Sequence, residues 1–137
     1  MSYLEKIYNL ENKVVAIYGG GGHICSKIAE GFLKAGSKVV LLDIRKKNLD
    51  ITFEKICKYN SKNLRILKVD STKKNHQIKS LKYCLKEFKK VDVLINGSGI
   101  NSPTDFFKIT EKNWNEVITS QLTSTFLGCQ IYGKYMV

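Results

Sequence analysis

The sequence predicts an α/β fold in which helices cover both faces of a parallel sheet. Short apolar, β-branched runs alternate along the chain with segments whose apolar residues recur every three or four positions. The first of these runs ends in four consecutive glycines, as at a turn from a strand into a helix. Strands that are apolar throughout are covered on both faces, and their alternation with helices implies right-handed crossovers. We therefore expect a doubly wound parallel sheet.

The first unit is β-α-β. Strands are expected over residues 13–18 and 38–43, and a helical pattern lies between them. Gly36 supplies the C-terminal stop of that helix. The apolar face of the helix is made of residues at helical spacing: Ile24, Ile28, Ala29, Phe32 and Leu33.

The same alternation continues along the rest of the chain. Third and fourth strands are expected over residues 64–69 and 91–96. The second helix is marked by Leu49, Phe53 and Ile56, and the third by Ile78, Leu81, Leu85 and Phe88. A last helix follows the loop with the only proline, Pro103, and begins after the N-cap residue Thr110. Its apolar residues lie four apart: Trp114, Ile118, Leu122 and Phe126.

The charge balance is strongly basic, at +11 from 23 Lys plus Arg against 12 Asp plus Glu. Such a balance suits a nucleic-acid or anionic-membrane partner. The lysines are dispersed over helix faces and loops, however, and form no basic block with interleaved aromatics. We therefore favour a solvated, Lys-rich surface over nucleic-acid binding, which remains an alternative.

Neither a membrane segment nor a metal site is indicated. No apolar run reaches the length of a signal peptide or a membrane span. The four cysteines lie far apart, without a Cys-x-x-Cys pair or a histidine at metal-ligand spacing: Cys25, Cys57, Cys84 and Cys129. They suggest free thiols in a reducing compartment. We expect a cytoplasmic protein of a single domain, residues 1–137.

The glycine run is a candidate phosphate-binding turn. Residues 18–24 read Tyr-Gly-Gly-Gly-Gly-His-Ile and lie between the first strand and the first helix. Backbone N–H groups and a helix N-terminus at this position can bind a pyrophosphate, and glycine lets the phosphate approach the main chain. A flexible hairpin loop would have the same composition. The position between strand and helix favours the phosphate site.

Asp43 closes the second strand, 24 residues after Gly19, where a carboxylate can meet the hydroxyls of an adenosine ribose. An acidic group there accepts hydrogen bonds from the diol and repels a 2′-phosphate. This favours NAD over NADP, although the neighbouring basic residues oppose the preference in part: Arg45, Lys46 and Lys47. The alternatives for Asp43 are a helix N-cap or a surface charge.

These residues together resemble the short-chain dehydrogenase/reductase family, over essentially the whole chain. The resemblance is carried by residues 10–14, the glycine run, Asp43, Val69-Asp70-Ser71 and Asn96-Gly97-Ser98-Gly99. The four glycines and residues 104–136 are most similar to the branch that contains D-mannonate oxidoreductase. The resemblance implies a Rossmann-like sheet that is truncated after about four strands and the following helix.

The resemblance also implies cofactor contacts. Gly19, Gly20, Gly21, Gly22, His23 and Ile24 would bind the pyrophosphate, and Asp43 and Ile44 the adenosine ribose. Asp70 and Ser71 would meet the adenine edge, while Asn96, Gly97 and Ser98 would support the sheet and the nicotinamide ribose. A purely structural role stays open for two of these residues. Asp70 could cap the third helix, and Asn96 could simply be the last residue of a strand.

Several positions depart from the family pattern. Tyr18 stands where the family usually has Thr, and His23 and Cys25 occupy places where many members have glycine. We expect the Cys25 side chain to loosen the turn. His23 is either a further phosphate contact or loop filler. Gln121 is the one candidate catalytic residue, since it lies where the family has an Asn that bends the helix and holds a proton-relay water.

The family's acid/base group is missing from these residues. Reduction or oxidation in the family needs a Tyr with a Lys four residues later, because an unassisted phenol is a poor base at neutral pH. None of the seven tyrosines has a Lys at that spacing. We therefore expect the cofactor-binding half of an NAD-dependent oxidoreductase for a sugar acid or another hydroxy or keto compound. The alternatives are a non-catalytic nucleotide-binding module and half of a split enzyme completed by another chain, and a homo-oligomer is also open.

Overall fold

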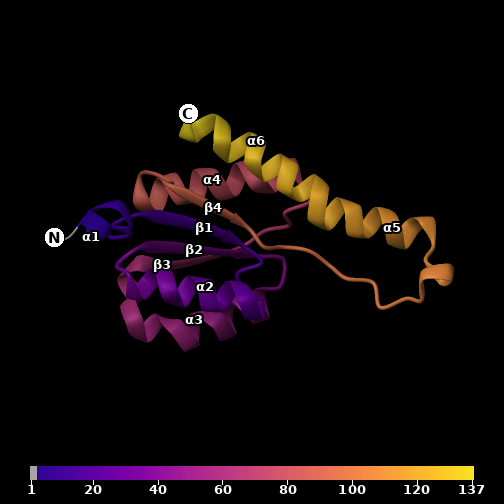
Figure 1. Cartoon of the computed structure of the whole chain (residues 1–137), viewed down its shortest axis with the longest axis horizontal. Coiled ribbons are helices and arrows are strands. Elements are labelled where there is room, and N and C mark those ends of the chain that lie inside the picture. Colours follow the sequence, from indigo (N-terminus) through magenta and orange to yellow (C-terminus); the bar gives the residue numbers. More distant parts are fainter. Residues whose placement is uncertain (1–2) are drawn as a thin grey trace.

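A computed structural model describes residues 3–137 and confirms the doubly wound α/β fold. Its four parallel strands are arranged in the order β3-β2-β1-β4 (Figure 1). They are β1 (Val14–Tyr18), β2 (Lys38–Asp43), β3 (Leu64–Lys68) and β4 (Val93–Asn96). Each strand lies within the residues expected for it, and the fourth begins two residues later than expected.

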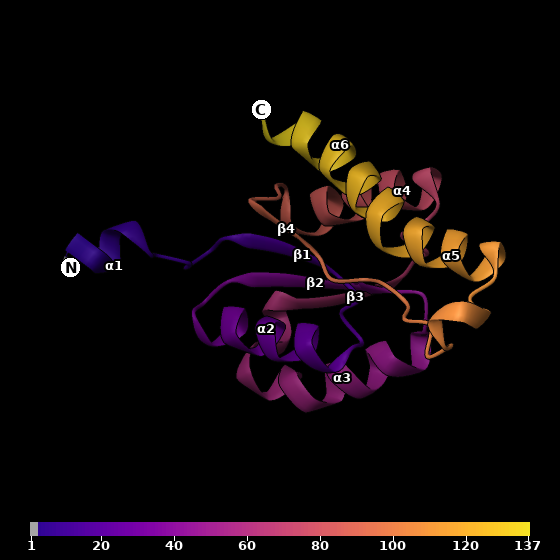
Figure 2. The same cartoon turned by 45° about the vertical axis from the view of Figure 1, so that its right-hand side comes forward.

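Helices cover the sheet on both faces. The helices are α1 (Tyr3–Ile7), α2 (His23–Lys34), α3 (Lys46–Asn60), α4 (Lys74–Phe88), α5 (Glu111–Ile118) and α6 (Ser124–Met136). Short 3-10 turns occur at Ser61–Asn63 and Phe106–Lys108. Helices α2 and α3 lie on one face and α4 and α6 on the other, whereas α1 lies apart from the sheet (Figures 1 and 2). None of the helices in residues 3–137 has the length and apolarity that crossing a bilayer requires.

The strand register brings the candidate site residues to one edge of the sheet. Tyr18 is level with Leu42 on one side and with Asn96 on the other. The carboxyl ends of β1, β2 and β4 therefore lie together, and the loops that follow them meet there. The apolar core on each face fixes this register, since every residue of β1 is buried.

The buried face of helix α2 matches the expected one only in part, since Ala29 and Leu33 are buried as expected. Ile24 and Ile28 are 73% and 36% exposed, so their placement in the apolar face was wrong. The buried residues are Cys25, Ala29 and Leu33. The small side chains of Cys25 and Ala29 let the helix approach the sheet closely. The buried face therefore contains Cys25 and Ala29, each one residue after Ile24 and Ile28. Gly36 does end the helix, with φ of 81°.

The last helical segment is interrupted, where one continuous helix was expected. A π-helical turn, Thr119–Thr123, separates α5 from α6. The expected apolar stripe faces outward, with Trp114, Leu122 and Phe126 all more than half exposed. The buried residues of α6 are Ser124, Gly128 and Tyr132. Thr110 is confirmed as the N-cap of α5, because its hydroxyl accepts from the Asn113 N–H.

Helix α4 buries two polar residues, Gln77 and Ser80, on the same face as Cys84 and Phe88. Its most buried residues are Gln77, Ser80, Cys84 and Phe88. The residues expected to form this face are only partly buried, with the exception of Phe88: Ile78, Leu81 and Leu85. The prediction from apolar spacing chose the larger side chains of the helix. The helix is instead rotated so that Gln77 and Ser80 face inward. All four cysteines are free.

Candidate functional site

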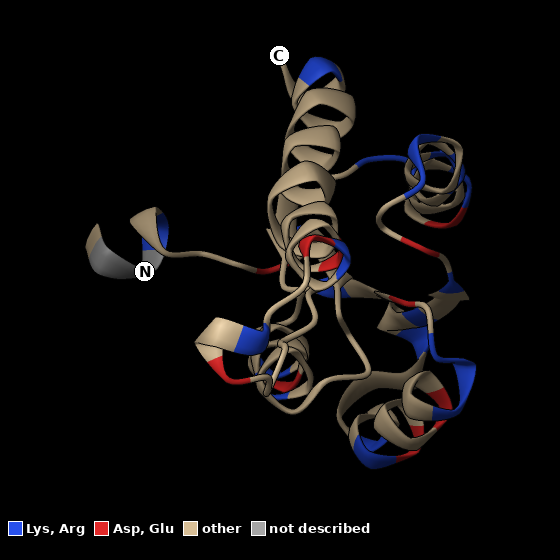
Figure 3. Cartoon of the chain, turned by 90° about the vertical axis from the view of Figure 1, so that its right-hand side faces the viewer, with Lys and Arg blue, Asp and Glu red and all other residues tan. Residues whose placement is uncertain are grey.

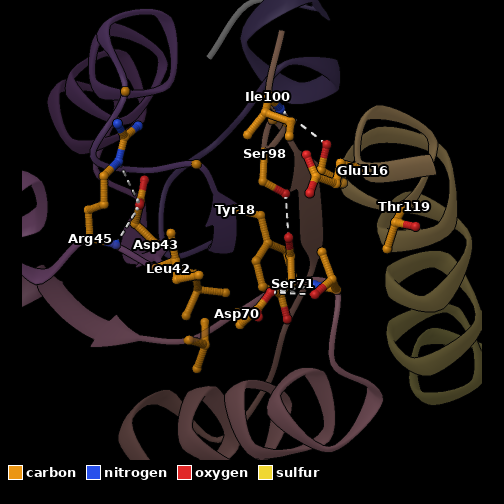
Figure 4. A pocket seen from close by; sticks show the side chains of 18 of the residues that line it. Tyr18, Leu42, Asp43, Arg45, Asp70, Ser71, Ser98, Ile100, Glu116 and Thr119 are labelled. Atoms are coloured by element: carbon orange, nitrogen blue, oxygen red, sulfur yellow. Dashed lines mark hydrogen bonds and ion pairs between the residues drawn. The ribbon is translucent and has the colours of Figure 1, made fainter. Parts of the chain in front are cut away.

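A cavity of about 980 Å³ lies at the carboxyl edge of the sheet. Its walls come from the loops after all four strands and from α5 (Figure 4). Eight of the expected cofactor residues line it: Gly19, Gly22, Asp43, Ile44, Asp70, Ser71, Gly97 and Ser98. Five lie beside it without lining it: Gly20, Gly21, His23, Ile24 and Asn96.

The glycine turn begins with a residue that only glycine fits well. Gly19 has φ of 73°, and a Cβ there would lie 2.5 Å from the Gly97 carbonyl oxygen. The Gly22 N–H donates to the Gly19 carbonyl at 2.8 Å, which closes the turn. The turn feeds α2, whose first N–H groups have no acceptor within the helix. This arrangement presents partial positive charge to the cavity.

The middle of the turn is anchored to β2 and faces away from the cavity. Gly20 donates its N–H to the Leu42 carbonyl at 3.1 Å and lies against Leu41. Gly21 donates its N–H to Asp43 Oδ2 at 3.1 Å. These contacts give both residues a structural role, and their contact with a phosphate stays a prediction.

His23 and Ile24 form the first two positions of α2. Both side chains are exposed, at the edge of the turn and outside the cavity lining. What these positions offer an anion is therefore backbone N–H groups. A contact of the His23 side chain with phosphate stays a prediction.

Asp43 is buried and holds two loops at once. Its Oδ2 accepts from Gly21, and its Oδ1 accepts from the Arg45 N–H at 2.9 Å, with the Arg45 Nε 4.0 Å away (Figure 4). A carboxylate offers about four acceptor positions, so about two remain for a ribose diol. The N-cap of α3 is Arg45, which excludes the alternative that Asp43 caps that helix. The clasp on Gly21 has no signal in sequence, because it depends on where β2 ends.

The loop after β3 is ordered by its own side chains. Asp70 Oδ1 accepts from both the N–H and the hydroxyl of Thr72, at 2.9 and 2.7 Å. The Asp70 N–H donates to His76 Nδ1 at 3.1 Å. The N-cap of α4 is Lys73, so Asp70 caps this turn rather than the helix. Ser71 shares a hydrogen bond of 2.8 Å with Ser98, which links this loop to the one after β4 (Figure 4).

The loop after β4 packs closely on α2. Gly97 has no room for a side chain, since a Cβ there would lie 2.2 Å from the Cys25 sulfur. Cys25 is 6% exposed and belongs to the core, so the expectation that it loosens the turn was wrong. Asn96 ends β4 outside the cavity lining, and its amide nitrogen lies 3.6 Å from the Cys129 sulfur.

Gln121 lies on the π-helical turn and is engaged with the β4 loop. Its side-chain nitrogen donates to the Ile100 carbonyl at 2.7 Å. The turn frees carbonyl groups that hydroxyls then satisfy, as Thr125 Oγ1 donates to the Gln121 carbonyl at 2.6 Å. Gln121 is outside the cavity lining, and its proposed catalytic role is untested.

One wall of the cavity was missed from the sequence. Residues of α5 and the π-helical turn line it: Glu111, Lys112, Asn115, Glu116, Thr119 and Ser120. They recur at helical spacing on the polar side of the helix, which is the signal that could have identified them. The Lys112 ammonium lies 3.9 Å from the Glu116 carboxylate. Basic residues, in contrast, are spread over several helices and loops (Figure 3).

Tyr18 forms the floor of the cavity and is 1% exposed. Its hydroxyl lies 2.5 Å from the Ser80 oxygen, which lies 2.9 Å from the Tyr132 hydroxyl. Burial raises the pKa of Tyr18 to about 12. This phenol therefore stays protonated well into the alkaline range and acts as a structural hydrogen-bonding group.

The family model described as short chain dehydrogenase matches residues 13–137. The NAD-dependent glycerol dehydrogenase of Listeria innocua is 30% identical over 133 residues, covering 97% of this chain and 51% of that protein. The 5-keto-D-gluconate 5-reductase of Escherichia coli K12 is 25% identical over 134 residues, with 98% and 52% covered. The chain thus spans about half the length of these relatives.

Solved structures have the same fold. A short-chain type dehydrogenase/reductase from Mycobacterium marinum superposes with a TM-score of 0.90 at 20% identity, covering 98% of this chain and 53% of that one. A short chain dehydrogenase/reductase from Burkholderia phymatum in complex with NAD gives a TM-score of 0.88 at 20% identity, with 94% and 46% covered.

Proposed function

We propose that this chain, which belongs to the short-chain dehydrogenase family, binds NAD and serves as the cofactor-binding half of an oxidoreductase. The observation that carries the proposal is the meeting of Gly19, Asp43 and Ser98 around one cavity at the carboxyl edge of the sheet. In open parallel α/β sheets, ligands bind in the crevice at this edge.

The residues fit a dinucleotide. The Gly19 turn packs against Gly97 too closely to admit a Cβ, and the start of α2 offers N–H groups to a pyrophosphate. Asp43 retains acceptor positions for the ribose diol, and Ser71 and Ser98 place hydroxyls on the opposite wall. When bound, NAD would carry the hydride of the reaction. These side chains hold it in place and leave the proton transfer to other groups.

A preference for NAD over NADP is part of the proposal. Asp43 is buried, and we assign it to the adenosine ribose, so that a second negative charge beside it would be unfavourable. Calorimetric titration should give tighter binding of NAD than of NADP, and the difference should shrink in Asp43→Ala. Because that variant also loses the clasp on Gly21, Asp43→Asn is the control, since it keeps one acceptor oxygen without the charge. Equal affinities in the parent chain would contradict the preference.

The substrate class is proposed from the relatives. The names glycerol dehydrogenase and 5-keto-D-gluconate 5-reductase support a polyol, a sugar acid or a similar hydroxy or keto compound. The narrower assignment to the D-mannonate oxidoreductase branch stays a prediction. A cytoplasmic location also stays one, supported by the four free thiols.

Turnover is expected to need residues that this chain does not supply. General acid–base assistance is worth about 10² to 10⁴ in rate, and no Tyr-x-x-x-Lys is present. The 137-residue chain should therefore give no NADH signal with NAD and glycerol. Adding a second segment with Ser and Tyr-x-x-x-Lys should restore turnover, measured as NADH formation. NAD binding without restored turnover would favour the alternative, a non-catalytic nucleotide-binding module.

A further inference from the structure

Gln77 of α4 is an unusual residue for its position. It is fully buried at the face of α4 that packs against the sheet and α6, where Cys84 and Phe88 provide the apolar contacts. An apolar side chain would suit this position better than an amide. Positions that break a local packing rule are often those with a functional reason.

The orientation of the Gln77 amide is fixed by two carbonyl groups. Its nitrogen donates to the Ser71 carbonyl at 2.6 Å and to the Ser124 carbonyl at 2.8 Å. Exchanging nitrogen and oxygen would place oxygen against two acceptors, so the oxygen must lie on the other side. That oxygen has no hydrogen-bond partner among the residues described. The side chain thus leaves a buried acceptor unpaired and keeps the two bonds of its nitrogen.

These two bonds connect the β3 loop, where Ser71 lines the cavity, with the start of α6. Ser71 belongs to the β3 loop, and its hydroxyl is hydrogen-bonded to Ser98 of the β4 loop at 2.8 Å. Ser124 opens α6 and donates to the Ser120 carbonyl at 2.5 Å. The Ser120 hydroxyl in turn accepts from the Ile100 N–H at 3.2 Å. Gln77 therefore joins two series of hydrogen bonds that both end in the β4 loop, one at Ser98 and the other at Ile100.

We propose that Gln77 is a positioning residue that fixes the β3 and β4 loops as walls of the dinucleotide cavity. It lies outside the cavity lining and acts through Ser71 and Ser124. The inference rests on the proposed binding of NAD, and it adds a residue for which neither apolar spacing nor the glycine motif gives a signal. Walls held in advance reduce the ordering that a ligand must otherwise impose.

The test compares Gln77→Leu with Tyr132→Phe. The first variant removes the amide and keeps a similar volume, and the second removes a buried hydroxyl that is hydrogen-bonded to Ser80 and to no residue of either loop. Calorimetry with NAD, well below the melting temperature of each variant, should show about tenfold weaker binding in Gln77→Leu. The NAD affinity of Tyr132→Phe should remain within about twofold of the parent, even if its melting temperature falls as far as that of Gln77→Leu.

Amide hydrogen exchange gives a readout that does not depend on NAD. Residues 71–73 and 97–100 should exchange faster in Gln77→Leu than in Tyr132→Phe. The loss of affinity in Gln77→Leu combined with Ser71→Ala should be smaller than the sum of the two single losses, because Gln77 acts in part through Ser71. Unchanged loop exchange, or equal NAD affinity in both variants, would overturn the inference. A parent chain that fails to bind NAD while its loops respond as expected would overturn only the proposed function.

Discussion

The Cys25 sulfur occupies the space above Gly97, so that a methyl group on Gly97 would lie 2.2 Å from it. The two residues belong to α2 and to the β4 loop, and they share one site. The family pattern has glycine at the position of Cys25, and here the glycine on the facing loop provides the room. The glycine turn is therefore not loosened by the cysteine side chain.

This relationship makes the two positions interdependent. Gly97→Ala should lower the free energy of unfolding by about 1 to 3 kcal/mol, because the added methyl group overpacks the site. Cys25→Ala in the same chain should recover part of that loss, since the Cys25 Cβ would lie 3.9 Å from the new methyl group while the Tyr18 carbonyl oxygen would stay 3.0 Å away. Urea denaturation of the parent, both single variants and the pair measures the coupling. Additive losses would contradict the shared site.

The buried hydroxyls of Tyr18, Ser80 and Tyr132 form a saturated network. Ser80 donates its single proton to the Gln77 carbonyl at 2.7 Å, so it must accept from both tyrosines. Ser80→Ala leaves two buried donors without an acceptor and should cost about 2 to 4 kcal/mol of unfolding free energy. The matched control is Ser80→Ala in a chain that already carries Tyr18→Phe and Tyr132→Phe, where the loss should be much smaller. Similar losses in both backgrounds would exclude the network.

The same groups predict instability at alkaline pH. Burial raises the pKa of Tyr18 from 10.0 to about 12 and that of Cys84 from 9.0 to about 12, and it also raises the pKa of Tyr132. The folded state therefore retains protons that the unfolded state releases, so this stability is complete below the unfolded values and is lost as pH rises. Unfolding free energy should be flat up to about pH 9 and then fall. Tyr18→Phe should reduce the slope between about pH 10 and 12, and an unchanged slope would refute this account.

The outward face of the last helical segment should cause self-association. Trp114, Leu122 and Phe126 are 59%, 65% and 58% exposed, and β4 is an edge strand of the described sheet. Sedimentation should show mass that increases with protein concentration, and Leu122→Lys with Phe126→Lys should reduce it. Ile28→Lys, at an exposed apolar position on α2, is the control and should have little effect. A monodisperse monomer at high concentration would contradict the expectation.

Sequence reasoning located the strands because each one is a continuous apolar run between turn signals. It also placed Gly19 and Asp43 at the same edge, since parallel strands share their carboxyl ends. It placed the buried face of α3 correctly at Leu49 and Ile56, but it erred on parts of the faces of α2, α4 and the last helical segment. Apolar spacing chose Ile24 over Cys25, but the depth to which a helix packs depends on its small residues. Spacing of this kind also gave no indication of Gln77, whose environment exists only once three elements have met.

The hydrogen bond between Gly21 and Asp43 and the π-helical turn could not be predicted from the sequence, for a related reason. Asp43 bonds Gly21 because β2 ends level with the turn, which is a property of the register and not of either residue. The π-helical turn depends on hydroxyls that satisfy freed carbonyl groups, and Ser and Thr are too common in helices for their positions to indicate this.

The strand order also has a kinetic consequence. Strand β1 is made first during synthesis, and its neighbour β2 follows after one helix, α2. Its other neighbour, β4, is separated from it by the whole of α2, β2, α3, β3 and α4. Loop closure is slower for longer intervening chain, so we expect β3, β2 and β1 to assemble before β4 docks. The hydrogen bond from the Val14 N–H to Asp92 Oδ2, 2.8 Å long, can then form only in the last step. In pulsed hydrogen exchange during refolding, protection of β4 ahead of β2 would rule out this sequence of events.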